Sequence, residues 1–244
     1  MNTLKANLES VQERIAAAAQ RAGRKASTVT LVAVTKTQGP EVIQTAYDLG
    51  LRHFGENRVE EAETKSGSLP GDVTWHMIGH IQSRKAKLVP PLFQVVHSVE
   101  SVKLARRLDR ACADRTEPLP VLLECNVSGE ASKYGFAADR WTGDLAQRNA
   151  LWTKVSEIVA LPHLSVQGLM TMAPILDDVE QARPIFAGLR RLRDELARAF
   201  PEADWRHLSM GMTDDFEVAI EEAATLIRVG RAIFSPTLPP WRKG

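Results

Sequence analysis

The sequence predicts a single (β/α)₈ barrel, an α/β fold, from three observations. The chain has 244 residues, a length at which α/β barrels commonly form one domain. Short apolar, β-branched runs alternate along it with amphipathic runs, and strict alternation of strands and helices is typical of a parallel sheet. Eight strand–helix units fill the chain and leave no segment for a second core, which favours a closed barrel over an open doubly wound sheet.

An extra helix is expected ahead of the first strand, over residues 2–24. Leu8, Val11 and Ile15 recur within it at spacings of three and four, which places them on one helical face. An apolar face of this kind has to be buried, so we expect this helix to cover the outside of the barrel.

Most of the eight expected strands are short runs rich in valine, isoleucine, leucine and threonine; those over 52–57 and 205–210 are short runs that contain an aromatic residue and a histidine. They cover residues 30–36, 52–57, 73–81, 92–98, 119–127, 164–172, 205–210 and 225–234. The helices expected between them cover residues 40–49, 58–65, 83–89, 99–113, 141–161, 179–200 and 214–224, with a loop over 129–140. The barrel would then span about 28–235, with a Pro-rich tail over 236–244, in one domain of residues 1–244.

The composition excludes several classes of protein. Lysine and arginine number 31 against 30 aspartates and glutamates, a net charge of +1, which lacks the basic surface expected for nucleic acid or an anionic membrane. No apolar stretch is long enough to span a bilayer, and the first residues lack the apolar segment of a signal peptide. Cys112 and Cys125 form no CxxC pair. We therefore expect a soluble, cytoplasmic protein.

The first expected strand ends on a lysine, Lys36. Alternation places Val32, Val34 and Lys36 on one face of that strand. A lysine at the end of a strand buried on both faces is expected to have little water around it. Desolvation disfavours the ammonium form, and the neutral amine is nucleophilic enough to form a Schiff base. The alternative is a lysine whose ammonium group reaches solvent.

The ends of the last two expected strands suggest an anion site. Ser209–Thr213 is a glycine-containing turn that opens the helix expected over 214–224. Free backbone N–H groups and hydroxyls at such a turn can hold a phosphate, and barrels commonly bind phosphate after strands 7 and 8. An ordinary helix-capping turn is the alternative.

An arginine lies on the last expected strand, on the same face as Leu226 and Gly230. Arg228 would therefore be surrounded by apolar neighbours, and a buried arginine needs an anion or another acceptor. That acceptor is either a ligand or a structural ion-pair partner. Gly230 would let a ligand approach the backbone, or would relieve crowding in the barrel.

The remaining inward candidates are Asn57, His80, Glu124, Asn126 and Met172. Glu124 and Asn126 share a face, where they either stabilise the barrel interior or contact a ligand. His76 and His80 would chelate a metal on a helix, but on a strand they lie roughly 13 Å apart, too far to share an ion. The sequence therefore predicts no metal site.

Seven motifs occur in an order that matches a known family. They are Val32–Thr37, His53–Asn57, Trp75–His80 followed by Gln82, Asn126–Lys133 followed by Gly135, Gly168–Met172, Leu208–Met212 and Ile227–Gly230. With these motifs the chain resembles the pyridoxal 5′-phosphate (PLP) homeostasis proteins, the YggS/PROSC family, from about residue 4 to residue 234.

The resemblance implies a barrel similar to the N-terminal domain of bacterial alanine racemases, with PLP held as a Schiff base on Lys36. It further implies that Thr213, and the backbone around Gly230 and Arg231, hold the phosphate. Arg228 would face the pyridine nitrogen and keep it unprotonated, which weakens the ring as an electron sink.

Five further residues complete the site that the resemblance implies. Ser209 and Met210 would lie close to the cofactor, while Asn57, His80 and Met172 would line the rest of the pocket. The chain also departs from the family pattern. Thr213 stands where serine is expected, Arg84 replaces an asparagine, Ala223–Ala224 replaces a Gly-Ser pair, and Ser235 replaces a glycine.

For function, the resemblance implies a PLP carrier without a defined turnover that buffers the cofactor and delivers it to apo-enzymes by transient contact. A monomer is implied. One alternative is a PLP-dependent amino-acid racemase of low activity, for which Tyr134 is the candidate second acid/base; the other tyrosine, Tyr47, lies in the first barrel helix. The other alternative is a class I aldolase-like enzyme that uses Lys36 without PLP.

Overall fold

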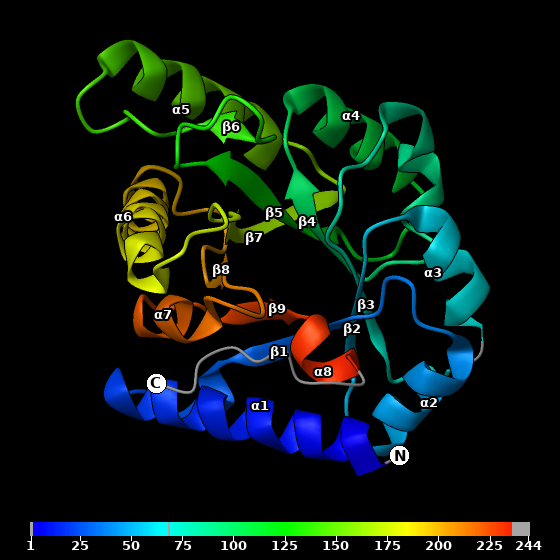
Figure 1. Ribbon diagram of the computed structural model, residues 1–244. Helices are drawn as coiled ribbons and strands as arrows, with labels where there is room; N and C mark the ends of the chain where they lie inside the picture. Colours follow the sequence, from blue (N-terminus) through cyan, green and yellow to red (C-terminus); the bar gives the residue numbers. More distant parts are fainter. Residues whose placement is uncertain (1, 68, 236–244) are drawn as a thin grey trace.

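The structure, a computed structural model, describes residues 2–67 and 69–235. Among these residues nine strands form one sheet in the order β4-β3-β2-β1-β9-β8-β7-β5-β6, and β4 also pairs with β5. Because β6 pairs with β5 alone, the other eight strands close into a ring of parallel strands wrapped by helices (Figure 1). The expected (β/α)₈ barrel is confirmed.

The strands of the ring are short, as closed barrels of parallel strands require. They are β1 Thr30–Val34, β2 His53–Glu56, β3 Thr74–Met77, β4 Val95–Val99, β5 Leu119–Asn126, β7 Leu164–Met170, β8 His207–Ser209 and β9 Leu226–Val229, with β6 Phe136–Ala137 outside it. The helices are α1 Asn2–Arg21, α2 Pro40–Asp48, α3 Val59–Ser66, α4 Val102–Ala111, α5 Leu145–Val159, α6 Arg183–Ala199, α7 Phe216–Glu221 and α8 Arg231–Phe234. Three 3₁₀ segments complete the described elements: η1 Ala26–Thr28, η2 Ser83–Leu88 and η3 Val179–Ala182.

Four expected elements differ clearly in the structure. The strand expected over 73–81 ends at Met77. The last expected strand, 225–234, ends at Val229, and α8 follows. The chain turns there because Gly230 adopts helical ψ and lies so close to β1 that a Cβ would stand 3.2 Å from the carbonyl oxygen of Val34. The expected helix over 83–89 is the 3₁₀ segment η2, and the expected loop over 129–140 contains the short strand β6.

The barrel interior contains only a small apolar cluster, made of Val32, Leu122, Met170 and Leu226. The main core lies outside the ring, between strands and helices, and takes the neighbouring strand residues such as Ala33. The alternation expected for the first and last strands is therefore confirmed. The small size of the inner cluster leaves room for polar side chains toward one end of the barrel.

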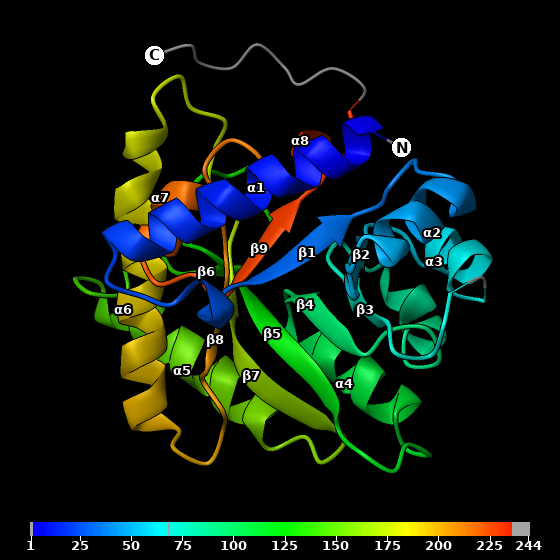
Figure 2. The same cartoon turned by 90° about the horizontal axis from the view of Figure 1, so that it is seen from below.

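Helix α1 covers one side of the barrel, as expected. Leu8, Val11 and Ile15 are buried in the main core, and the helix packs against α7 and α8 (Figure 2). Gly23 ends it in the left-handed region, at φ +65°, where glycine carries no Cβ penalty. The expected proline-rich tail, 236–244, lies outside the described residues.

No helix within residues 2–67 and 69–235 is both long and apolar enough to cross a membrane.

Candidate functional site

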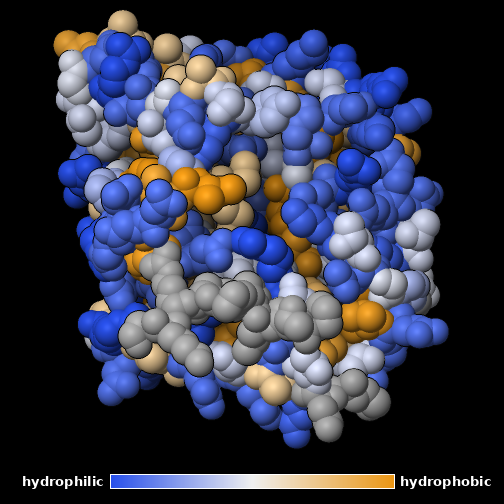
Figure 3. All heavy atoms as spheres, in the orientation of Figure 1, coloured by the Kyte–Doolittle hydropathy of each residue, from blue (hydrophilic) through white to orange (hydrophobic). Residues whose placement is uncertain are grey.

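The carboxyl ends of the strands face the viewer in Figure 1 and form the mouth of the barrel. Figure 3 shows the same face, hollowed near its centre between patches of hydrophobic residues. Lys36 lies at this mouth, in the turn after β1. Its side chain is exposed, so the expectation of a lysine with little water around it is wrong. The reason is that β1 ends at Val34, which places Lys36 beyond the last buried strand position.

A buried ion pair holds the backbone beside Lys36. Lys65 of α3 donates to the carbonyl oxygen of Thr35 at 3.0 Å and to Oε1 of Glu56 at 2.8 Å. The Thr35 hydroxyl donates to the same Glu56 oxygen at 2.5 Å. Glu56 is wholly buried at the end of β2 and Lys65 is 6% exposed. These contacts fix the residue before Lys36 on the outer side of the ring, so the turn itself is not free to move.

The other side of the same turn is also held. Thr37 adopts φ +66°, a left-handed conformation that is costly for a β-branched residue. Its backbone N–H donates to Oε2 of Glu61 at 3.3 Å. Lys36 therefore stands between two anchored residues, and its own side chain is exposed.

Arg228 lies in the barrel interior, as alternation predicts, and is 4% exposed. Its guanidinium donates to Oγ of Ser209 at 2.5 Å and to the carbonyl oxygen of Thr171 at 2.9 Å. Burial lowers the pKa of Arg228 to about 10, so it remains a cation at neutral pH. Its partners are neutral acceptors rather than an ion-pair carboxylate, which leaves a buried positive charge at the bottom of the mouth.

Three histidines continue from Ser209 through the interior. His97 Nδ1 lies 2.8 Å from Ser209 Oγ, His76 Nδ1 lies 2.9 Å from His97 Nε2, and His53 Nδ1 lies 3.0 Å from His76 Nε2. Desolvation by burial lowers the pKa of His76 to about 3 and that of His97 well below its ordinary range. Sequence reasoning considered only His76 and His80 as a pair, and missed this row because it crosses three strands.

A carboxyl group also faces the mouth. Glu124 on β5 is 4% exposed, and burial, followed by repulsion from Glu100, raises its pKa to about 7. Asn126, expected to share a network with it, instead shapes the following loop: it donates to the carbonyl oxygen of Glu130 at 2.8 Å and accepts from the Gly129 N–H at 3.0 Å. Both residues of the predicted polar face are present, but the partners of Asn126 lie in the loop and do not include Glu124.

The ends of β8 and β9 form a cradle of hydrogen-bond donors. Thr213 is 4% exposed, and its hydroxyl oxygen lies 3.5 Å from the N–H of Ala232 in α8, which brings the two segments together. Within the described residues, the backbone N–H groups of Thr213 and Arg231 have no hydrogen-bond partner. The Arg231 side chain points away and pairs with Asp214 at 2.5 Å. Unpaired N–H groups beside a hydroxyl are the donor set that a phosphate needs.

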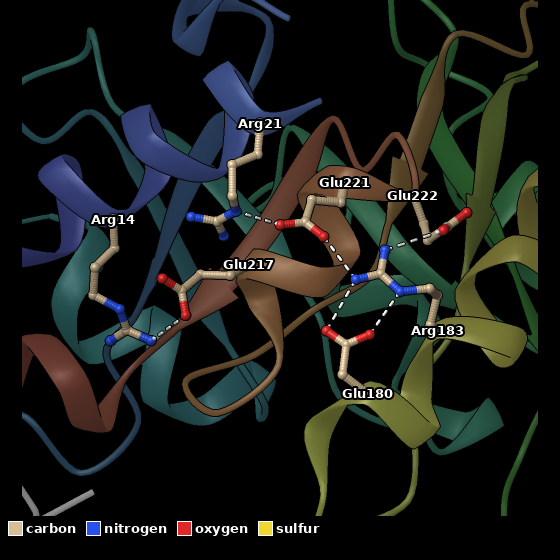
Figure 4. Close-up of polar contacts among 7 residues, drawn as sticks. All are labelled: Arg14, Arg21, Glu180, Arg183, Glu217, Glu221 and Glu222. Atoms are coloured by element: carbon tan, nitrogen blue, oxygen red, sulfur yellow. Dashed lines mark hydrogen bonds and ion pairs between the residues drawn. The ribbon is translucent and has the colours of Figure 1, made fainter. Parts of the chain in front are cut away.

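Ion pairs hold the helix that follows this cradle. Glu221 of α7 accepts from Arg21 of α1 and from Arg183 of α6, both at 2.7 Å, and Glu217 accepts from Arg14 at 3.2 Å (Figure 4). Two elements distant in sequence, α1 and α6, therefore anchor α7. The turn over Ser209–Thr213 thus lies between β8 and a helix that ion pairs join to α1 and α6.

No group of three or more histidine, cysteine, aspartate or glutamate side chains in the described part of the chain is arranged to hold a metal ion. His80 lies beyond the end of β3, while His76 lies on the strand between two other imidazoles.

Comparison with known proteins places this geometry in a family. Residues 6–237 match the family described as "Alanine racemase, N-terminal domain". The chain is 41% identical over 235 residues, 96% of each chain, to the pyridoxal phosphate homeostasis protein of Pseudomonas aeruginosa. It is 40% identical over 228 residues, 93% of this chain and 95% of the relative, to that of Aquifex aeolicus. The chain belongs to the pyridoxal phosphate homeostasis protein family.

Solved structures agree with the assignment to the pyridoxal phosphate homeostasis protein family. PipY of Synechococcus elongatus, solved with PLP bound, is 32% identical, with a TM-score of 0.79 over 95% of this chain and 99% of that one. Alanine racemase of Corynebacterium glutamicum is 18% identical, with a TM-score of 0.65 over 93% of this chain and 60% of that one, and this likeness shows the fold alone.

Three of the residues that the resemblance places in the site have different surroundings in the structure. The Met210 side chain is wholly buried in the main core outside the ring, because it directly follows Ser209 and so points to the opposite face. His80 is exposed at the rim, 2.9 Å from a Glu100 oxygen and stacked on Tyr134 with ring centroids 4.4 Å apart. Met172 packs against the inner apolar cluster.

A cavity of about 630 Å³ opens beside the mouth, and both Asn57 and His80 line it. The cavity lies over the ends of β2 and β3, so these two residues form the side of the site away from the phosphate cradle. Asn57 directly follows the end of β2, whereas His80 lies three residues beyond the end of β3 and not on the strand expected over 73–81.

Three of the positions at which this chain departs from the family pattern have local structural consequences. Ala223, where the family pattern has glycine, adopts φ +74°, a left-handed conformation suited to glycine. Arg84 is exposed and donates to Gln82 at 3.1 Å. The carbonyl oxygen of Ser235 accepts from Asn7 of α1 at 3.0 Å. None of the three contacts Lys36 or Arg228.

Proposed function

We propose that this protein binds PLP as a Schiff base on Lys36. The observation that carries the proposal is that one barrel mouth holds an accessible lysine, a buried arginine and a donor cradle. Thr213 and the backbone at Gly230 and Arg231 would receive the phosphate, and Arg228 would face the pyridine nitrogen. The PLP-bound relative PipY, which covers nearly the whole chain, supports the same cofactor.

Each residue has a distinct task in this arrangement. PLP supplies an aldehyde for the lysine amine and an aromatic ring that can take up electron density. Arg228 would present N–H groups and positive charge to the ring nitrogen, which would favour a nitrogen that accepts a hydrogen bond over one that carries a proton. The buried pair Glu56 and Lys65 holds the turn that carries Lys36, and the cradle holds the opposite end of the cofactor.

Asn57, His80, Met172 and Ser209 would complete the pocket. Met172 and Ser209 belong to the interior side, while Asn57 and His80 line the adjoining cavity. Met210 would contribute through its backbone, which is held by a hydrogen bond from its N–H to the Leu226 carbonyl oxygen at 3.1 Å.

We infer that the protein's role is PLP homeostasis: it buffers the cofactor and delivers it to apo-enzymes by transient contact, without catalytic turnover. The exposure of Lys36 supports release, since a lysine open to water can exchange its carbonyl partner. A cytoplasmic monomer is the expected form. The names of the relatives, which are pyridoxal phosphate homeostasis proteins, support this role over an enzyme.

A racemase of low activity is the second candidate, and Glu124 and Tyr134 favour it because both supply an acid/base group at the mouth. A class I aldolase-like reaction on Lys36 without PLP is the third. Incubation of the PLP-loaded protein with single enantiomers of common amino acids separates the first two. The homeostasis role predicts no racemisation but restoration of activity to a PLP-depleted apo-enzyme. Racemisation without such transfer would contradict it.

A further inference from the structure

A row of polar side chains crosses the inside of the barrel from β2 to β9. It runs from His53 through His76, His97 and Ser209 to Arg228, with successive contacts of 3.0, 2.9, 2.8 and 2.5 Å. Its members come from five different strands, and β4 and β8 are not neighbours in the ring. The row therefore spans the interior rather than following one strand pair.

The direction of every hydrogen bond in the row follows from its two ends. Arginine side chains only donate hydrogen bonds, so the Ser209 oxygen accepts from Arg228. Ser209 is wholly buried, and within the described residues its hydroxyl contacts only Arg228 and His97. A buried hydroxyl hydrogen needs an acceptor, and His97 Nδ1 is the one available. Ser209 therefore donates to His97.

The same logic passes along the row. A histidine that accepts at Nδ1 is neutral and carries its hydrogen on Nε2. His97 Nε2–H then donates to His76 Nδ1, and His76 Nε2–H donates to His53 Nδ1. His53, which is partly exposed, ends the row with its own Nε2–H free to meet water. Each of the three histidines therefore has one permitted tautomer, with its hydrogen on Nε2. A hydrogen on any Nδ1 would break the row of hydrogen bonds.

We infer that His97, His76 and His53 form a one-way hydrogen-bond chain that orients the Ser209 hydroxyl and so positions Arg228. Without an acceptor at His97, the Ser209 hydrogen would turn toward Arg228 and oppose its N–H. The guanidinium is otherwise held only at Thr171, and would be free to rotate. The three histidines are positioning residues for the face that Arg228 turns toward the mouth.

Two further observations agree with this hydrogen-bond chain. Desolvation by burial lowers the pKa of His53, His76 and His97 alike, in agreement with neutral rings. His207 lies on β8, the strand that carries Ser209, but its Nδ1 faces the Thr225 hydroxyl at 3.2 Å. His207 is thus a half-buried histidine of the barrel that forms no link of the hydrogen-bond chain, and it serves as a matched control.

The direct test needs no cofactor. Isotope-labelled histidine in the ligand-free protein allows long-range proton–nitrogen NMR to identify the protonated ring nitrogen of each residue, with single variants for assignment. We expect His76 and His97 to be neutral at neutral pH with the hydrogen on Nε2. A hydrogen on Nδ1 of either residue, or a cationic ring, would contradict the proposed direction of the hydrogen bonds.

The positioning role is tested with PLP, and this step rests on the proposed function. His97→Leu should weaken PLP binding about tenfold, the size expected for one unsatisfied buried group, and should shift the visible band of the bound cofactor. His97→Asn, which keeps an acceptor near the Nδ1 position, should restore most of both, and His207→Asn should change neither.

A His97→Leu protein that unfolds cooperatively and keeps the wild-type band and affinity would overturn the positioning role. If the wild-type protein binds no PLP at all, the proposed function fails instead, and the NMR result still decides the direction of the chain. The two failures are therefore distinguishable.

Discussion

Lys65 Nζ and Glu56 Oε1 lie 2.8 Å apart behind the turn that carries Lys36. Both side chains are buried, and Lys65 also donates to the Thr35 carbonyl oxygen one residue before Lys36. An ion pair on the outer side of the ring thus sets where the proposed anchor of the cofactor projects. The pair links the stability of the barrel to the position of its reactive lysine.

Removing the lysine of this pair should be strongly destabilising. Lys65→Met leaves the Glu56 carboxylate buried without its cation, and breaking a buried pair in this way costs about 3–5 kcal/mol. The free energy of unfolding from urea titration measures the loss. Lys85→Met, which breaks a pair with the largely exposed Glu60, is the control and should change little. Equal effects of the two variants would show that the buried pair has no special role.

Replacement of Ala223 by glycine should stabilise the fold. Ala223 adopts φ +74°, where a Cβ costs about 1 kcal/mol relative to glycine. Ala223→Gly should therefore raise the free energy of unfolding by about 1 kcal/mol, less the entropy that glycine adds to the unfolded chain. The neighbouring Ala224→Gly, at a buried position with ordinary φ, should lower it. A destabilised Ala223→Gly protein would contradict this account.

The buried histidines should make the fold sensitive to acid. Burial lowers the pKa of His76 to about 3, from 6.5 in an exposed histidine. Below pH 6.5 the unfolded state takes up a proton that the folded state refuses, so stability falls as pH falls, by about 1.4 kcal/mol per pH unit for such a residue. Above pH 6.5, the pKa of an exposed histidine in the unfolded state, the effect is absent.

A pH series of unfolding titrations checks this with two variants. His76→Asn removes the titrating group, so its stability relative to wild type should improve steadily between pH 7 and pH 5. Glu124, with a pKa raised to about 7, acts in the opposite sense in both proteins and cancels in the difference. His163→Asn, at a partly exposed histidine, is the control. A pH-independent difference for His76→Asn would be the contrary result.

The hydroxyl of Thr213 should matter more than its methyl group for cofactor affinity. Thr213→Val keeps the shape and removes one proposed donor to the phosphate, so PLP should bind about tenfold more weakly. Thr213→Ser should bind like the wild type. Fluorescence titration with PLP provides the measurement. Unchanged affinity of the valine variant would remove Thr213 from the proposed cradle.

Local sequence patterns predicted the parts of this structure that depend on one strand at a time. Alternation correctly placed Val32, Leu226 and Arg228 inside the ring. It failed where the end of an element decides the outcome: Lys36 is exposed because β1 ends two residues before it.

The histidine chain could not be predicted in the same way. In the β2–β3 register His53 pairs with Thr74, while His76 pairs with Gly55. The ring contact between the two histidines therefore arises from the stagger of neighbouring strands, which no single strand encodes. Seven matching motifs indicated the family and Lys36 as the proposed anchor of the cofactor. The residues that hold the Lys36 turn and Arg228 in place could be identified only from the three-dimensional structure.

The claim that PLP is bound through Lys36 can be measured directly in the purified protein. The visible absorbance spectrum is recorded with added PLP before and after borohydride, and the reduced protein is mapped by mass spectrometry, with Lys36→Ala treated in parallel. We predict a visible band that borohydride removes, a pyridoxyl adduct on Lys36, and neither in Lys36→Ala, which should still unfold cooperatively. A colourless protein with no adduct, or an adduct on another lysine, would contradict the account.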